Sequence, residues 1–265
     1  MKKLLVVFFT VALGFQSFGQ HKTIFGKNPL LNKPDWDKQR VHWGYYLGFN
    51  SFNYKFNYDE KYYTRLQTLK EKYPNTATEV QVQNSIGFNV GLVGNLRLFE
   101  YLDLRFEPGL AYTKRDLLIP QALIINHLDQ SGVPVIDPTT LNSYSTRNDS
   151  STYIHFPLLL KFSALRTGNI RPYVVGGVSA DLNLTSNSKS TEENPTIWRT
   201  KQWTSNYELG LGMDIYFEYF KFSPSIRGVF GLDDAMIRDE NPNSPWTGNI
   251  GSMKSRGIFV NFTFH

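Results

Sequence analysis

Apolar and polar residues alternate along most of the chain from residue 41 onward. Phe88 and Val90, for example, share one face of residues 85–98, whereas Asn89 and Gly91 share the other. A period of two is the signature of a β-strand with two different faces. The pattern predicts eight strands, at residues 41–56, 85–98, 101–116, 151–164, 170–184, 203–217, 220–232 and 253–265.

The bulk of the two faces decides which one points into the barrel. Alternation alone also fits a soluble lipocalin-like barrel, which is apolar inside and polar outside. Eight strands, however, enclose a space just wide enough for side chains to fill, and the Phe, Leu and Tyr residues of the apolar face would overfill it. The apolar face is therefore expected to point outward into lipid. The predicted fold class is all-β, an eight-stranded antiparallel up-and-down transmembrane β-barrel of outer-membrane type.

The connections between the predicted strands alternate between short and long. Short turns are expected at residues 99–100, 165–169 and 218–219, and long connections at 57–84, 117–150, 185–202 and 233–252. Outer-membrane barrels combine short periplasmic turns with long external loops. The order predicts that both termini lie in the periplasm and that all four long loops lie outside the cell.

Aromatic residues make up 15% of the chain and gather near the predicted periplasmic interface. The expected girdle consists of Trp43, Phe99, Tyr101, Phe217, Tyr219, Phe220, Phe262 and Phe264. Tyr112, Trp203 and Tyr207 are expected near the opposite rim. Two aromatic belts are typical of transmembrane barrels, because amphipathic rings prefer the headgroup level.

The N-terminus has the features of an export signal, because Lys2 and Lys3 precede an apolar run that small residues follow. The expected division is a signal peptide at residues 1–20, a periplasmic lead-in segment at 21–40 and the barrel domain at 41–265. A mean hydropathy of -0.34 with 19% charged residues is too polar for a helical membrane protein. With no cysteine in the chain, no disulfide framework is expected.

Charged residues of both signs fall on the face predicted to line the lumen. They are Asp103, Arg105, Glu107, Lys161, Arg171, Asp181, Glu208, Asp214, Lys221 and Arg227. One interpretation is a gated polar channel, and the other is a paired network that plugs the barrel, in which buried charges compensate one another. The plug is favoured because eight strands leave no continuous aqueous path of useful width.

The sequence contains no phosphate-binding loop, zinc-protease motif or nucleophile elbow. Some outer-membrane barrels are lipid-modifying enzymes with a Ser/His/acid set at the outer surface or rim. His155 beside Ser150 and Ser151 is the one weak candidate for such a set. Because a lone His on a strand more often packs or faces water, we expect a non-enzymatic protein with no cofactor and no metal site.

The net charge of +5 does not indicate nucleic-acid binding, because the basic residues form no stripe with interleaved aromatics. Several instead lie near the predicted outer rim, namely Lys114, Arg115, Arg199, Lys201, Arg238, Lys254 and Arg256. These residues either contact lipopolysaccharide phosphates by charge pairing or are ordinary solvated charges, and the second alternative is favoured. Outer-membrane lipid is the expected partner, with lipopolysaccharide as a further candidate.

The first long loop contains a stripe of apolar residues at helical spacing. Tyr62, Leu66, Leu69 and Tyr73 form this stripe, and Pro74 ends it. The spacing predicts a short external helix. Its stripe either docks a partner protein or packs across the barrel mouth, and packing is favoured.

Particular strand sequences carry a family resemblance. The first strand contains HWGYYLGFN at residues 42–50, a middle strand contains FPLLLKF at 156–162 followed by RPY at 171–173, and the last strands contain FKFSP at 220–224 and SMKSR at 252–256. In these segments the chain resembles the PorT family, outer-membrane proteins of type IX secretion and gliding motility. The resemblance covers most of the predicted barrel.

The resemblance implies a barrel that is required for export of cargo proteins across the outer membrane and, in gliding species, of surface adhesins. It implies no catalytic residue. Because eight strands cannot pass folded cargo, other secretion-machinery proteins are the implied partners. The alternatives are a generic structural or adhesive barrel without a secretion role and a lipid-modifying enzyme. The chain departs from the usual aromatic ending of outer-membrane barrels, because His265 follows Phe264.

Overall fold

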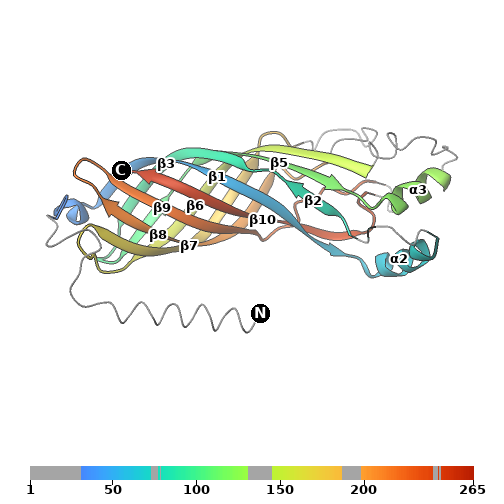
Figure 1. Ribbon diagram of the computed structural model, residues 1–265, viewed down its shortest axis with the longest axis horizontal. Helices are drawn as coiled ribbons and strands as arrows, with labels where there is room; N and C mark the ends of the chain where they lie inside the picture. The colour runs from blue at the N-terminus through green and yellow to red at the C-terminus, as the bar shows by residue number, and fades with distance from the viewer. Residues whose placement is uncertain are drawn as a thin grey trace.

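Eight antiparallel strands close into a barrel in the computed structural model, which describes residues 31–72, 77, 79–130, 145–186, 198–240, 244 and 246–265. The strands are β1 (Val41–Tyr58), β2 (Gln81–Asn84), β3 (Gly87–Arg97), β4 (Leu102–Phe106), β5 (Gly109–Leu118), β6 (Thr146–Ser163), β7 (Ile170–Asn183), β8 (Trp203–Tyr216), β9 (Lys221–Gly231) and β10 (Ile250–Phe264). β1 pairs with β10 on one side and with β3 on the other, which closes the ring. The predicted all-β, eight-stranded antiparallel barrel is confirmed (Figure 1).

One of the eight barrel strands is divided into two segments, β4 and β5. Pro108 lies between them and has no N–H to donate to a neighbouring strand. The register with β3 is the same on both sides of this interruption, because Phe106 opposes Gly94 and Gly109 opposes Gly91. β4 and β5 are therefore one barrel strand with a local gap in its hydrogen bonds. The short β2 continues β3 toward the loop end, because both pair with β5, with a one-residue register shift between Asn84 opposite Arg115 and Phe88 opposite Tyr112.

The two ends of the barrel differ in their connections (Figure 1). The turn end carries the three short connections, the C-terminus and the short helix η2 (Trp36–Lys38). The loop end carries the long connections with α2 (Glu60–Lys72), which matches the predicted helix, and α3 (Gln121–Gln130), which the sequence pattern did not predict. Within the described ranges, no helix has the length and apolar character needed to cross a membrane, a result that leaves membrane crossing by strands untouched.

Some strands extend further toward the loop end than the sequence pattern predicted. β6 begins at Thr146 instead of residue 151, and β10 begins at Ile250 instead of residue 253. In the added part of β6 both faces of the strand are polar, so the alternation that locates a strand is lost. The hydrogen-bonded pairing with β5 nevertheless continues as far as Thr146.

Alternate residues divide between the outer wall and the lumen as the pattern predicted. On the outside, Phe88 is 56% exposed and Leu211 is 59% exposed, and Leu104 is half-exposed. On the inside, Asn89 and Asp214 are each 2% exposed. Bulky apolar residues therefore form a belt around the barrel, while small and polar residues fill its interior.

An apolar cap lies at the loop end. It joins inward-facing residues of β1, β5 and β10 to residues of α2, α3 and the neighbouring loops. Its buried members are Tyr54, Tyr62, Leu69, Leu117, Ile119, Ala122, Leu123, Ile124, Trp198, Ala235, Met236, Ile250 and Met253. The long connections thus bury their own apolar side chains against the top of the barrel.

A charge placed in the outward belt should destabilise the barrel. Leu211 faces outward near the middle of β8, between Val174 and Ile226 on the neighbouring strands. Leu211→Arg should therefore lower the free energy of unfolding in phospholipid vesicles by about 2–4 kcal/mol. Leu184→Arg, just beyond the loop end of β7, is the control and should cost at most about 1 kcal/mol. Equal losses in the two variants would contradict a lipid-facing belt.

Candidate functional site

A column of charged side chains runs along the lumen. Nine of the ten residues predicted to line it are buried, namely Arg105, Glu107, Lys161, Arg171, Asp181, Glu208, Asp214, Lys221 and Arg227. Asp103 is only half-buried and lines a recess at the turn-end mouth with His42 and Arg171. Charges of both signs thus meet in a narrow space away from water.

Asp214 organises the layer of the column nearest the turn end. Its carboxylate accepts a hydrogen bond from Lys161 Nζ at 2.6 Å and from Ser223 Oγ at 2.6 Å, and Lys221 Nζ lies 3.5 Å away. Lys161 Nζ also lies 4.1 Å from the centroid of the Tyr173 ring. One carboxylate of β8 therefore compensates ammonium groups from β6 and β9.

Two glutamates and two arginines form the middle layer. Glu107 pairs with Arg105 and accepts a hydrogen bond from Arg227 Nη1 at 2.6 Å. Arg227 Nε lies 3.2 Å from Glu208 Oε2, so this guanidinium bridges two carboxylates. Arg105 Nη2 also donates to Thr263 Oγ1 at 3.1 Å, which links β4 to β10.

His155 continues the column toward the loop end. Its Nδ1 pairs with Asp181, and its Nε2 lies 2.9 Å from Glu208 Oε1. The side chain is buried, and the neighbouring Ser151 donates its hydroxyl to Asp149 at 2.8 Å. The ring of His155 therefore points into the lumen between two carboxylates and away from the outer surface, which agrees with packing as the favoured alternative.

Arg115 forms a fourth layer near the loop end, and the expectation that it is a solvated or lipopolysaccharide-contacting rim charge is wrong. It is fully buried, with Nη2 2.9 Å from Asp149 Oδ2 and 2.7 Å from the hydroxyl oxygen of Tyr153. Its guanidinium carbon lies 4.2 Å from the centroid of the Tyr54 ring, and the Tyr54 hydroxyl donates to Asp149 at 2.6 Å. Because Tyr54 also belongs to the apolar cap, charged column and cap meet here.

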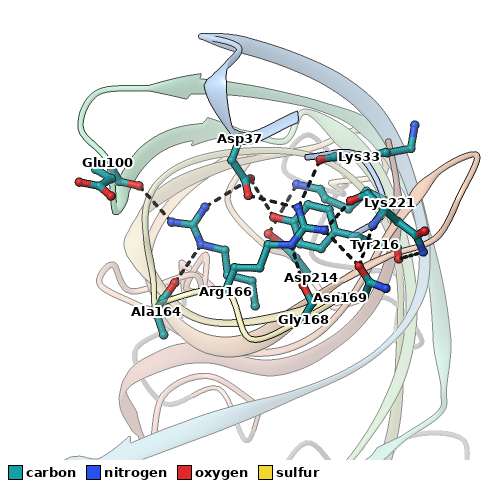
Figure 2. Close-up of polar contacts among 12 residues, drawn as sticks. Lys33, Asp37, Glu100, Ala164, Arg166, Gly168, Asn169, Asp214, Tyr216 and Lys221 are labelled. Atoms are coloured by element: carbon teal, nitrogen blue, oxygen red, sulfur yellow. Dashed lines mark hydrogen bonds and ion pairs between the residues drawn. The ribbon is translucent and has the colours of Figure 1, made fainter. Parts of the chain in front are cut away.

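Residues 31–40 contact the turn-end mouth and are called the turn-end stopper below. Asp37, in η2, is its main contact with the barrel (Figure 2). Its carboxylate lies 3.3 Å from Arg171 Nη1 and 3.7 Å from Arg166 Nη1, and it accepts a hydrogen bond from the Tyr216 hydroxyl at 2.8 Å. A carboxylate from the lead-in segment thus meets two arginines of the barrel.

Backbone contacts hold the start of the stopper in place. Arg166 donates to the carbonyl oxygens of Asn32 and Lys33, and its guanidinium carbon lies 3.7 Å from the centroid of the Tyr216 ring (Figure 2). The Asn32 backbone N–H donates to Asn169 Oδ1 at 3.0 Å. These contacts could not be predicted from the sequence, because the stopper has neither periodicity nor a recognisable motif.

The girdle aromatics gather toward the turn end. They are Trp43, Phe99, Tyr101, Phe217, Tyr219, Phe220, Phe262 and Phe264, of which Trp43 is 75% and Tyr219 is 83% exposed. Phe217 stacks on Phe220, with ring centroids 4.9 Å apart. This placement fits the expected interfacial belt.

The stripe on α2 is turned toward the barrel. Tyr62 is 1% exposed and Leu69 is 7% exposed, both within the apolar cap. The Tyr62 and Leu69 side chains are therefore not available to a partner, and they pack across the barrel mouth as the favoured alternative expects. The side chain of Leu66 and the whole of Tyr73 lie outside the described residues.

The chemistry of the column is charge compensation. Each of its four layers pairs carboxylates with basic side chains, and Asp214 and Glu107 each bridge two cations. Such pairing is what makes buried charges tolerable. Across the residues that the structure describes, no group of His, Cys, Asp and Glu is arranged to hold a metal ion. The arrangement can hold strands in register and occupy the space through which ions would have to pass.

Removing Asp214 should be strongly destabilising. Asp214→Asn leaves Lys161 and Lys221 buried without their carboxylate and should lower the free energy of unfolding in vesicles by about 3–5 kcal/mol. Adding Lys161→Met should recover part of this loss, because one uncompensated charge disappears. Asp103→Asn, at the half-exposed mouth, is the control and should cost at most about 1 kcal/mol. A double variant as unstable as the sum of its single variants would rule out the coupling.

Comparison with solved structures finds other small outer-membrane proteins. They include OprG from Pseudomonas aeruginosa, with 12% identity and a TM-score of 0.39 over 85% of this chain and 96% of that chain. Neisserial surface protein A has 8% identity and a TM-score of 0.35 over 83% and 95% of the two chains. Ail of Yersinia pestis has 8% identity and a TM-score of 0.33 over 85% and 98%.

Sequence comparisons give a family. No curated protein matches this sequence. The family model described as "Outer membrane protein beta-barrel domain" matches residues 18–236, which is most of the chain and includes all barrel strands up to β9. Since this match extends over far more than half of the sequence, the chain belongs to the outer membrane protein beta-barrel domain family.

Proposed function

We propose that this protein is a sealed, non-enzymatic outer-membrane barrel that acts through contacts with partner proteins as an accessory component of type IX secretion and gliding motility. The observation that carries the proposal is the filled lumen. Four layers of paired charges, from Asp214 to Arg115, follow one another between the turn-end stopper and the apolar cap. A barrel filled in this way offers its surfaces, and not its interior, to other molecules.

The proposed orientation places the turn end in the periplasm and the loop end outside the cell. Short turns at one end and long connections at the other support this orientation, because outer-membrane barrels have short periplasmic turns. The stopper would then be the described part of the periplasmic lead-in segment. Partner contacts would come from the lead-in segment, the outer wall and the external loops.

The secretion role is supported by the resemblance of the barrel strands to the PorT family. The segments at residues 42–50 and 252–256 carry it most specifically, and they lie on β1 and β10, which are neighbours in the barrel wall. A protein with this wall and a filled lumen would assist export without conducting cargo itself.

The sealed lumen is tested by electrical recording. The mature protein in planar lipid bilayers should give no steady conductance steps, because ion pairs occupy each level of the lumen. A variant lacking residues 31–40 should also stay closed, since the layers from Asp214 to Arg115 are retained. A large general porin recorded in the same bilayers is the positive control. Regular single-channel steps from the intact protein would overturn the proposal of a sealed barrel.

The secretion role is tested by deleting the gene in its native bacterium. Cargo proteins that carry the type IX export signal should accumulate inside the cells, and the wild-type gene supplied in trans should restore their release. The measurement is the amount of cargo in the medium relative to the cells. Unimpaired export, with cell-surface adhesion altered instead, would favour the generic structural or adhesive barrel.

A further inference from the structure

Three basic residues lie together on the outer wall near the loop end. Lys55 of β1 stands directly opposite Lys254 of β10, and Arg256 of β10 stands opposite Asn53. Lys55 and Arg256 are exposed, and Lys254 is half-buried. Residues of the other parity on β10, such as Met253, are buried, so the three cations share the outward face. This group is called the wall cluster below.

The wall cluster is a local concentration of like charge. Side chains directly opposite on paired antiparallel strands have Cβ atoms about 5 Å apart, and like charges in that position are destabilising. No ion pair of these three side chains occurs among the described residues. Asp234, on the connection that leads to β10, is already engaged by Arg238 and by the Met253 backbone N–H.

The height of the wall cluster indicates what would compensate its charge. Going up β10 from the turn end, the outward residues are apolar as far as Ile258, and Arg256 and Lys254 come next. On β1 the outward residues are apolar as far as Phe49, and Ser51 follows. The cluster therefore stands directly above the apolar belt, at the level where lipid headgroups meet the barrel wall.

We propose that the wall cluster binds the phosphate groups of an outer-leaflet lipid. The proposal rests on the orientation proposed above and is independent of the secretion role. Lys and Arg form charge-assisted hydrogen bonds with phosphate oxygens, and Arg does so in a bidentate geometry. Two lysines and one arginine on adjacent strands suit the head of a phosphorylated glycolipid whose acyl chains lie against Phe49 and Ile258. The bound phosphates would offset the repulsion between Lys55 and Lys254.

The test compares the mature protein with the triple variant Lys55→Gln, Lys254→Gln and Arg256→Gln in phosphatidylcholine nanodiscs. The probes are diphosphorylated lipid A and the same lipid with both phosphates removed, and bound lipid is quantified by native mass spectrometry. The wild type should prefer the phosphorylated probe. The triple variant should bind it at least about fivefold more weakly, since three ion pairs are lost. Lys114→Gln, a lone outward cation on β5 opposite Ser150, is the matched control and should change binding less than twofold.

A competition experiment and a folding control complete the test. Inorganic phosphate at millimolar concentration should not displace the lipid, which distinguishes a lipid site from a free-anion site. The triple variant should keep the β-sheet circular dichroism of the wild type, because its substitutions lie on the wall surface. Equal binding of the two probes by the wild type, or undiminished binding by a folded triple variant, would overturn the proposal. Since the assay uses purified protein, neither result depends on cargo export.

Discussion

The narrow interior of an eight-stranded ring governs the rest of this structure. Strand alternation directs every second side chain into a space that side chains alone must fill. The outward side chains must be apolar where they face lipid, so the lumen is the one place for charges within the spanning part. A lone buried charge is costly, and each charge therefore needs an opposite one. Asp214 between two lysines and Glu107 between two arginines meet this requirement.

The same pairs tie strands that are distant in sequence. Glu107 and Arg227 are 120 residues apart, yet they meet in the middle of the lumen. A slip of β9 by one residue would turn Arg227 into lipid and Ile226 into the lumen, and would break its bridges to Glu107 and Glu208. Charge pairing thus acts together with backbone pairing to specify one register. A barrel whose lumen were merely small and polar would lack this constraint.

The strands of the barrel wall and the direction of their faces could be predicted from the sequence. The reason is that lipid requires apolar side chains and the lumen requires small or polar ones, so neighbouring residues along a strand differ. The sequence also identified most lumen charges, since parity alone decides on which side they lie. Alternation also places His155 and Arg115 on the inward face, because they share the odd-numbered positions of Lys161 and Ala111. Alternation does not show how deeply a side chain is buried. The expectation of a solvated or lipid-contacting rim charge is wrong for Arg115, because Asp149 and the Tyr54 ring contact it in the lumen.

Other parts could not be predicted from a local pattern. Which carboxylate meets which cation depends on the closure of the ring, since partners such as Lys161 and Asp214 are 53 residues apart. The contact of Asp37 with Arg166 and Arg171 joins an irregular segment to the turn before β7 and to the start of β7, and the irregular segment has no periodicity. In the loop-end part of β6 both faces are polar, so the contrast between faces disappears. In each case the deciding contact is long-range, so a window of neighbouring residues does not contain it.

The two ends of the barrel are closed by different chemistry, and this difference bears on where partners can bind. The turn end is closed through charged and hydrogen-bonded contacts of residues 31–40, the turn-end stopper. The loop end is closed by an apolar cap that buries Tyr62 and Leu69, while Tyr63 and Trp203 near it stay exposed. The cap side chains are used for packing and are not available to a partner. The recognition proposed at that end therefore uses charge and hydrogen bonding, which is the chemistry of the wall cluster and of phosphorylated lipid.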